Sequence, residues 1–228
     1  MKFAVIPARG GSKRIPRKNI KLFCGKPMIA WSIEAALQSD CFDRVLVSTD
    51  DAEIAEVARQ FGAQVPFMRP AELADDHTST TAVIAHAIDW FSANGHPPNQ
   101  VCCIYATAPF VTAKDLRRGF AVFTETGCEY AFAVTSYAFP IQRAIRITQA
   151  DRVEMFNPEQ FSTRSQDLEN AYHDAGQFYW GKASAWLKGS IIFSNASAPV
   201  MLPRHRVQDI DTPEDWLRAE WLFKALQA

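Results

Sequence analysis

Short runs of hydrophobic residues recur along most of the chain, separated by longer stretches of mixed character. Four of these runs, at residues 2–8, 44–49, 101–106 and 130–134, contain few polar side chains. A run of this length without regular polar alternation predicts a strand that is covered on both faces. We expect these four runs, and a fifth at residues 177–180, to form a central sheet.

The stretches between the runs have the spacing of amphipathic helices. Apolar residues share one stripe at each of four places, marked by Ile29 and Ile33, Ile54 and Val57, Val83 and Ile84, and Leu116 and Phe120. Helix-start signals precede three of them, namely Thr49 or Asp50, Thr78 or Ser79, and Thr112 with Asp115 three residues on. A last helix is predicted after Thr212, because Pro213 suits the first helical turn.

This alternation of strands and helices predicts one α/β domain over residues 1–228. We expect a three-layer architecture, with helices on both faces of a mostly parallel, Rossmann-like sheet. Sheets of this kind bind ligands at the carboxyl ends of their strands. The alternation breaks at residues 137–170, where Pro140, Pro158 and many polar residues leave one short strand at 144–148. We interpret this segment as an inserted excursion, either an arm for pairing two copies or a flap over the active site.

Composition and charge narrow the classes of function. The chain carries 24 Lys and Arg residues against 25 Asp and Glu residues, a formal net charge of -1. No global field therefore draws it to nucleic acid or to an anionic membrane surface. It has neither a secretory signal pattern nor an apolar run of the ~20 residues that span a bilayer, so we expect a cytoplasmic protein without membrane contact. Its five cysteines contain no C-x-x-C pair, which argues against a disulfide framework or a thiolate zinc site.

The segment at residues 8–19 is the strongest chemical signal. It places five cations, Arg9, Lys13, Arg14, Arg17 and Lys18, in one glycine-containing loop directly after the first predicted strand. Backbone N–H groups and cations that converge at a strand end suit a triphosphate. The loop lacks the G-x-x-x-x-G-K-[ST] and G-x-G-x-x-G motifs, so it is neither a Walker loop nor a dinucleotide fingerprint. A solvated basic turn is the alternative interpretation.

Asp209 and Asp211 form a second candidate group. Residues i and i+2 of an extended segment point to the same face, so both carboxylates can reach one cation. Mg²⁺ typically takes one or two carboxylates together with phosphates and water. The alternative is that Asp211 or Thr212 only caps the following helix, and the residues alone leave the two interpretations balanced.

The cationic loop resembles the A-R-x-x-S-K-x-x-x-x-K-N signature of the CMP-sialic acid synthetase family. The resemblance continues, in the same order, at residues 47–50, 69–74, 107–109 and 209–212. It implies transfer of CMP from CTP to the anomeric hydroxyl of a nine-carbon acidic sugar, with release of pyrophosphate and with Mg²⁺ held by Asp209 and Asp211. It also implies a homodimer that pairs through an inserted arm.

The resemblance assigns roles to further residues. Arg9, Lys18 and Asp211 are the expected catalytic residues. The expected nucleotide-binding residues are Ala8, Arg9, Gly10, Ser12, Lys13, Lys18, Asn19, Thr78 and Ser79. For the sugar we expect Tyr105, Thr107, Arg164, His173 and Gln177, with Asp174 in the same group. Arg164 is the candidate partner of the sugar carboxylate, because a forked guanidinium matches a carboxylate, although a solvated arginine in the excursion is the alternative.

The chain departs from the sialic acid pattern around the expected sugar site. It has Tyr105 where similar synthetases have glutamine, and His173 where many have arginine. Fewer polar groups and more apolar surface favour pseudaminic acid, which has a terminal methyl and a second acylamino group, over N-acetylneuraminic acid. The open alternatives are another CMP-sugar-acid synthetase, such as a CMP-Kdo synthetase, a CTP-binding regulator without catalysis, and a dinucleotide-binding protein.

Overall fold

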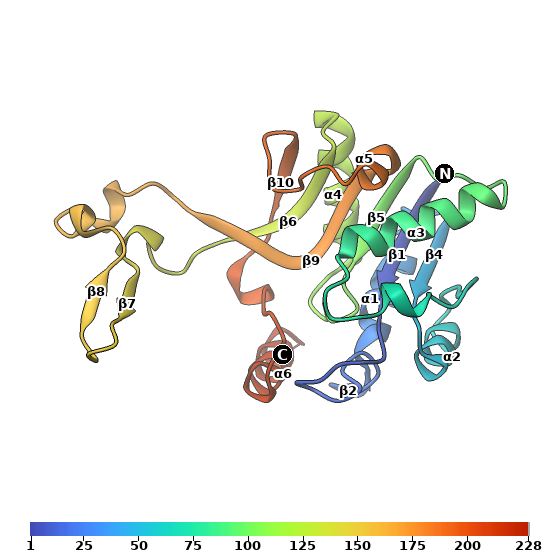
Figure 1. Ribbon diagram of the computed structural model, residues 1–228, viewed down its shortest axis with the longest axis horizontal. Helices are drawn as coiled ribbons and strands as arrows, with labels where there is room; N and C mark the ends of the chain where they lie inside the picture. The colour runs from blue at the N-terminus through green and yellow to red at the C-terminus, as the bar shows by residue number, and fades with distance from the viewer. Residues whose placement is uncertain (228) are drawn as a thin grey trace.

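A twisted six-stranded sheet with helices on both faces forms the body of the molecule (Figure 1). The computed structural model describes residues 1–227. The sheet strands are β1 (Lys2–Pro7), β4 (Arg44–Ser48), β5 (Gln100–Ile104), β6 (Tyr130–Ser136), β9 (Tyr172–Lys182) and β10 (Ser197–Met201). The helices are α1 (Met28–Gln38), α2 (Ala52–Gln60), α3 (Thr80–Ala93), α4 (Ala113–Thr126), α5 (Ala183–Lys188) and α6 (Pro213–Gln227). The five predicted strands and the five predicted helices are all present.

The sheet has the order β10-β6-β9-β5-β1-β4. β1 pairs in parallel with β4 and β5, and β10 pairs in parallel with β6. Only β9 runs antiparallel, between β5 and β6. The expected mostly parallel sheet is therefore confirmed, with one reversed strand in its middle.

Alternate residues of β1 supply two separate cores, as the period of a strand requires. Ala4 and Ile6 pack into a cluster with residues of α1, α2 and α4 on one face. Phe3 and Val5 pack with residues of α3 and α5 on the other face. The three predicted layers are thus confirmed, and the central strand is covered on both sides.

A third, smaller core fastens the terminal helix to the cationic loop. Ile15 from the loop and Ile210 from the segment before α6 are buried together with Phe23, Trp216 and Phe223. Residues at the two ends of the chain therefore lie side by side. This packing brings the Asp209–Asp211 segment to the loop at residues 8–19.

Helix starts follow the predicted signals, with one correction. Ser79 caps α3, and Thr112 caps α4 by accepting from the Asp115 N–H. The cap of α2 is Asp51, which accepts from the Ile54 N–H at 3.0 Å, and not Thr49 or Asp50. The physical reason is that Asp50 is turned back to the cationic loop, where it accepts from the Gly10 N–H.

Two elements of the three-layer body, α5 and β10, have no counterpart in the sequence prediction. α5 is only six residues long, and β10 contains Pro199. Proline inside an apolar run argues against a central strand, but β10 is an edge strand, where a missing N–H donor is tolerated. The local sequence of these two elements therefore does not predict them, and their formation depends on packing against the rest of the sheet and its helices.

The excursion at residues 137–171 projects from the sheet, on the left of Figure 1. Its tip is an antiparallel hairpin of β7 (Ile145–Ile147) and β8 (Val153–Met155). A second small pair, β2 (Leu22–Phe23) and β3 (Lys26–Pro27), lies beside the cationic loop. Short 3-10 turns occur at η1 (Ala71–Leu73), η2 (Ile141–Arg143), η3 (Pro158–Gln160), η4 (Ser165–Asp167) and η5 (Arg204–Arg206).

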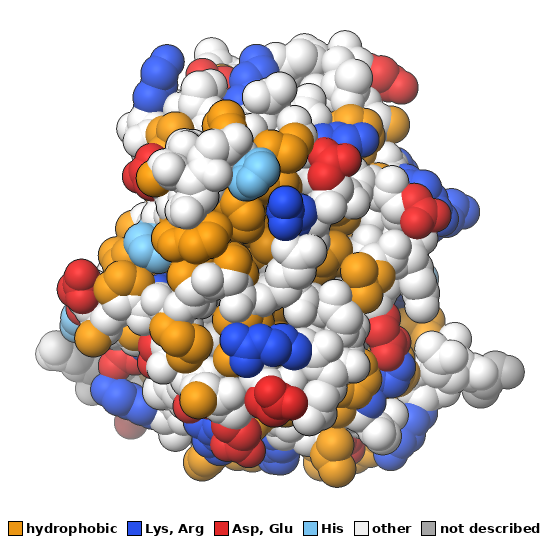
Figure 2. Space-filling model, turned by 90° about the vertical axis from the view of Figure 1, so that its right-hand side faces the viewer, with side chains coloured by type: hydrophobic (Ala, Val, Ile, Leu, Met, Phe, Trp, Pro, Cys, Tyr) orange, Lys and Arg blue, Asp and Glu red, His pale blue; other side chains and the backbone are white. Residues whose placement is uncertain are grey.

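Charged side chains of both signs are interspersed on the face shown in Figure 2. Apolar side chains gather in a central strip of that face. Within residues 1–227, no helix combines the length and the apolar character needed to cross a bilayer.

Candidate active site

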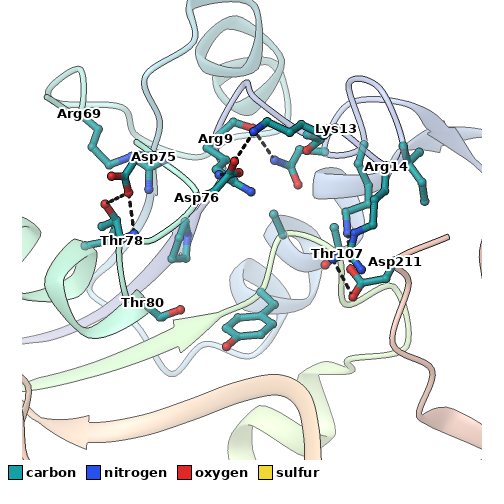
Figure 3. A pocket seen from close by; sticks show the side chains of 18 of the residues that line it. Arg9, Lys13, Arg14, Arg69, Asp75, Asp76, Thr78, Thr80, Thr107 and Asp211 are labelled. Carbon is teal, nitrogen blue, oxygen red and sulfur yellow. Dashed lines mark hydrogen bonds and ion pairs between the residues drawn. The ribbon is translucent and has the colours of Figure 1, made fainter. Parts of the chain in front are cut away.

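A polar cavity of about 320 Å³ lies at the carboxyl ends of β1 and β5, and we call it the first cavity. The expected residues that line it come from four distant parts of the chain: Arg9, Ser12, Lys13, Lys18, Asn19, Thr78, Tyr105, Thr107 and Asp211. Figure 3 shows several of these side chains facing the same space. The site therefore occupies the position that parallel α/β sheets offer to ligands.

Hydrogen bonds to the backbone hold the cationic loop in place. The Asn19 amide donates to the Arg9 carbonyl at 2.9 Å, and the Gly10 N–H donates to Asp50 at 3.1 Å. A Cβ atom at Gly10 would lie 2.7 Å from an Asp51 carboxylate oxygen, so this position needs glycine. Ala8 and Gly10 are absent from the lining of the first cavity. Their contribution is to place the neighbouring cations.

Four of the five loop cations line the first cavity, and the fifth turns away. Arg17 has a left-handed backbone with φ of 56°, and its guanidinium binds Asp51 and Glu53. Arg17 thus fastens the loop to α2 rather than facing the cavity. Of the five loop cations, Arg9, Lys13, Arg14 and Lys18 line the cavity, and their contact with phosphates stays a prediction.

Asp76 neutralises part of this charge, and the sequence had not singled it out. Its carboxylate lies between Arg9 and Lys13 and accepts a hydrogen bond from each (Figure 3). Hydrogen bonds from Lys13 and Arg9 lower the pKa of Asp76 to about 2. The preceding Asp75 accepts from the N–H and the hydroxyl of Thr78, which fixes the turn that presents Asp76.

Arg69 is a buried cation at the rim of the same cavity. Only 3% of its side chain is exposed, and its nearest charged partner is Asp50 at 3.4 Å. Its Nε atom has no hydrogen-bond partner within residues 1–227. Burial lowers the pKa of Arg69, although Asp50 opposes the shift. The resemblance at residues 69–74 was the signal that could have placed Arg69 among the binding residues.

Thr78 and Ser79 take different positions. Thr78 lines the first cavity, whereas Ser79 is absent from that lining. The Ser79 hydroxyl oxygen accepts from the Ala82 N–H at 3.2 Å and so caps α3. Of the expected pair, only Thr78 faces the nucleotide-sized space.

The two carboxylates of the Asp209–Asp211 segment are also placed differently. Asp211 lines the first cavity, 3.2 Å from the Lys18 ammonium and 2.9 Å from the Arg14 guanidinium. Asp209 lies outside this lining. The surrounding protein partly desolvates Asp209 and, with the nearby charge of Asp211, raises its pKa. The cap of α6 is formed by Thr212 and Asp215, so the Asp211 carboxylate is not used as a helix cap.

A second cavity, of about 360 Å³, adjoins the first and shares Thr80 and Tyr105 with it. Its polar residues include Asp174, which accepts from the Tyr179 hydroxyl and from the Gly176 N–H. Burial raises the pKa of Tyr105 and of Tyr179, so both are neutral hydroxyls. Apolar residues at 191–193 complete the wall. The sequence had pointed to Tyr105 and Asp174 but not to Tyr179 or the apolar wall.

Three residues expected to contact a sugar line neither cavity: Arg164, His173 and Gln177. Arg164 lies in the projecting excursion, where it pairs with Asp167 at 2.7 Å. His173 is turned to the Asp174 carbonyl, and its ring packs against Tyr137. Gln177 is buried and donates to the Arg206 carbonyl at 2.6 Å.

An α/β sheet with a cationic cavity at its strand ends is the arrangement of a nucleotide-binding protein. Two solved structures have the same fold. A CMP:2-keto-3-deoxy-manno-octonic acid synthetase complexed with CTP aligns with a TM-score of 0.70 at 18% identity, over 99% of both chains. A 4-diphosphocytidyl-2C-methyl-D-erythritol synthase from Anaerococcus prevotii aligns with a TM-score of 0.63 at 11% identity, over 100% of this chain and 98% of that one.

Residues 3–209 match the Cytidylyltransferase family, and the chain belongs to that family. It is 47% identical over 220 residues to the pseudaminic acid cytidylyltransferase of Campylobacter jejuni, covering 96% of this chain and 95% of that protein. It is 34% identical to the CMP-N,N'-diacetyllegionaminic acid synthase of Legionella pneumophila, covering 98% and 97%. The expected enzyme class is confirmed, which removes the dinucleotide-binding alternative.

Proposed function

We propose that this cytidylyltransferase transfers CMP from CTP to the anomeric hydroxyl of pseudaminic acid and releases pyrophosphate. The observation that carries the proposal is a cationic cavity that adjoins a second, partly apolar cavity and shares Thr80 and Tyr105 with it. The 47% identity to a relative named for this reaction, along nearly the full length of both chains, supports the same substrate.

The first cavity is the proposed site of CTP. Arg9, Lys13 and Lys18 supply positive charge to the phosphates, and Ser12 and Thr78 supply hydroxyl groups. In the reaction the sugar oxygen forms a bond to the α-phosphorus while the bond to the pyrophosphate oxygen breaks and the hydroxyl proton is released. Positioning and charge stabilisation are sufficient for this chemistry, and no covalent intermediate on the protein is required.

We expect Asp211, which lines the first cavity, to be the main carboxylate ligand of Mg²⁺, with Asp209, two residues earlier and outside that lining, as a second hard oxygen donor. Within residues 1–227 no group of three or more His, Cys, Asp or Glu side chains is arranged for a metal, so the phosphates would complete the coordination. Partial burial first, and the charge of Asp211 second, raise the pKa of Asp209, and a divalent cation bound beside it would favour its charged form. When bound there, Mg²⁺ would neutralise phosphate charge and help to orient the α-phosphate.

The second cavity is the proposed site of the sugar. Asp174 and the Tyr179 hydroxyl supply polar contacts, while Ile191 and Phe193 supply an apolar wall. A sugar with a terminal methyl and two acylamino groups places more apolar carbon against such a wall than a polyhydroxylated sugar does, at about 0.8 kcal/mol per buried carbon. This comparison favours pseudaminic acid over N-acetylneuraminic acid.

Pyrophosphate release measured with CTP, Mg²⁺ and a panel of nine-carbon sugar acids tests the proposal. Pseudaminate should give a kcat/KM at least ~100-fold above that of N-acetylneuraminate, the scale that a few pocket contacts supply. Equal rates would overturn the substrate while keeping the cytidylyl transfer. CTP binding without pyrophosphate release for any sugar would instead support a non-catalytic regulator.

A further inference from the structure

A buried ion pair lies outside both cavities, where the segment that carries Asp209 and Asp211 begins. The Arg206 guanidinium is 2.8 Å from each carboxylate oxygen of Asp115 in α4, and Asp115 is only 4% exposed. The backbone of Arg206 is held as well, because its carbonyl accepts from Gln177 of β9 at 2.6 Å. One residue is thus connected to a helix through its side chain and to the sheet through its main chain.

This attachment is close to the cavity along the chain. Two residues separate Arg206 from Asp209, and an extended chain spans about 3.3 Å per residue, so Asp209 is within ~10 Å of the anchored point. The far end of the segment is fixed separately. The Ile210 carbonyl accepts from the Lys18 ammonium at 2.6 Å, and the Ile210 side chain is buried. Arg206 provides the attachment at the near end.

Gln177, which holds the Arg206 main chain, is a buried residue of the sheet strand β9. Its side chain is 3% exposed, and its Oε1 atom has no hydrogen-bond partner within residues 1–227. A buried amide oxygen without a partner costs stability. The hydrogen bond from the Gln177 Nε2 to the Arg206 carbonyl therefore offsets part of the cost of burying this amide.

We propose that Arg206 is a positioning residue, which Asp115 and Gln177 hold so that Asp211 stays at the first cavity beside Lys18. Arg206 acts through the segment and does not itself line the first cavity. The inference rests on the proposed function for its catalytic consequence. Its structural part, the ordering of residues 207–212, stands independently of the substrate.

The test compares Arg206→Met with Arg204→Met. Arg204 is an exposed matched control two residues earlier, whose side chain reaches only the Tyr137 carbonyl at 3.4 Å. In Arg206→Met, amide hydrogen exchange at residues 207–212 should rise at least ~10-fold, and kcat should fall about 10- to 100-fold, because small misplacements of a positioned group have effects of that size. KM for CTP should change less than ~3-fold, and Arg206→Lys should recover part of kcat.

A second variant, Asp115→Asn, is needed because Arg206→Met removes one partner of the buried Asp115 carboxylate and could destabilise the fold for that reason alone. Asparagine keeps the volume and the N–H that bonds to Thr112 at the start of α4, and its amide oxygen can still accept from the Thr112 hydroxyl as the Asp115 carboxylate does. Exchange and kcat that match those of Arg204→Met in both variants would overturn the proposal. Exchange that rises uniformly over the sheet in Asp115→Asn and Arg206→Lys would also overturn it in favour of a purely structural role. If the wild type releases no pyrophosphate, the proposed function fails, and the exchange at residues 207–212 still decides whether Arg206 orders the segment.

Discussion

In the proposed CTP site, Asp76 occupies the position at which a phosphate group would meet Arg9 and Lys13. Its carboxylate pairs with both cations, and its pKa of about 2 keeps it charged at neutral pH. An incoming triphosphate must therefore replace an anion that belongs to the protein. The contribution of each cation to ligand binding therefore depends on its existing ion pairs, because a paired cation attracts a ligand less strongly than a free one.

The first prediction follows from this competition. Asp76→Asn should bind CTP about 3- to 10-fold more tightly, since roughly 1.4 kcal/mol corresponds to a tenfold change in affinity. Calorimetric titration measures the dissociation constant, with the exposed neighbour Glu72→Gln as a control that leaves it unchanged. Weaker binding by Asp76→Asn would mean that Asp76 contributes a favourable contact to the bound nucleotide or to a cation with it.

The second prediction concerns the carboxylates at residues 209 and 211. Asp211→Asn should raise the Mg²⁺ concentration needed for half-maximal rate and lower kcat, because it removes a charge that lines the first cavity. Asp209→Asn should shift the Mg²⁺ requirement in the same direction with a smaller loss of kcat. Pyrophosphate release across a Mg²⁺ series gives both values.

Thr212→Ala is the matched control, because Thr212 caps α6 and its side chain has no part in the proposed metal site. It should lower the unfolding midpoint while leaving the Mg²⁺ requirement unchanged. If Asp211→Asn also lowered the unfolding midpoint without changing the Mg²⁺ requirement, Asp211 would have a structural role and would not bind the metal.

Among the elements, the start of α2 contributes both to the stability of the fold and to the position of the cationic loop. Asp51 caps this helix and also binds Arg17, which anchors the cationic loop in a left-handed turn. Its hydrogen bond with Arg17 lowers the pKa of Asp51 to about 2, against an ordinary value of 3.8. A carboxylate with a lowered pKa stabilises the fold above the ordinary value, and this stabilisation disappears as the pH falls through the lowered pKa.

The third prediction uses Asp51→Asn, which keeps a capping side chain and removes the charge. At pH 7 its free energy of unfolding should be lower than that of the wild type by about 1–2 kcal/mol, reduced from the full pKa shift by solvent screening. The difference should shrink between pH 4 and pH 2, where Asp51 of the wild type becomes protonated. Urea unfolding at several pH values measures it, and a constant difference down to pH 2 would contradict the assigned ion pair.

At the scale of the whole molecule, the excursion at residues 137–171 leaves large apolar side chains in water. Phe139 is 83% exposed and Phe161 is 76% exposed, and β7 and β8 contact each other rather than the sheet. Exposed apolar patches of this kind mark interaction surfaces. We propose that the excursion buries these apolar side chains against a second copy of the chain.

The fourth prediction is therefore a homodimer. Light scattering at micromolar concentration should give twice the mass of one chain, and Phe139→Ser combined with Phe161→Ser should shift the mass towards one chain. Trp221→Ser is a matched control, since Trp221 is 63% exposed on α6, away from the excursion. A mass of one chain for the wild type would rule out the dimer and leave a flap over the active site as the remaining role.

Local patterns along the sequence determined most elements and the location of the charged loop. A buried strand, an amphipathic helix and a capping residue each depend on a few neighbouring positions, so runs such as residues 101–106 predicted strands correctly. The concentration of cations after the first strand is equally local. This information was sufficient for the three-layer α/β class and for the position of the cationic cavity.

The tertiary structure alone decided which partner each side chain meets. Arg17 bonds to Asp51 instead of facing the cavity, and the Gln177 side chain donates to the Arg206 carbonyl and lines neither cavity. The reversed direction of β9 and the second cavity behind Tyr105 arise in the same way, from contacts between segments far apart in the chain. Periodicity and spacing contain no information on such contacts, because burial and hydrogen bonding are settled only when the layers pack together.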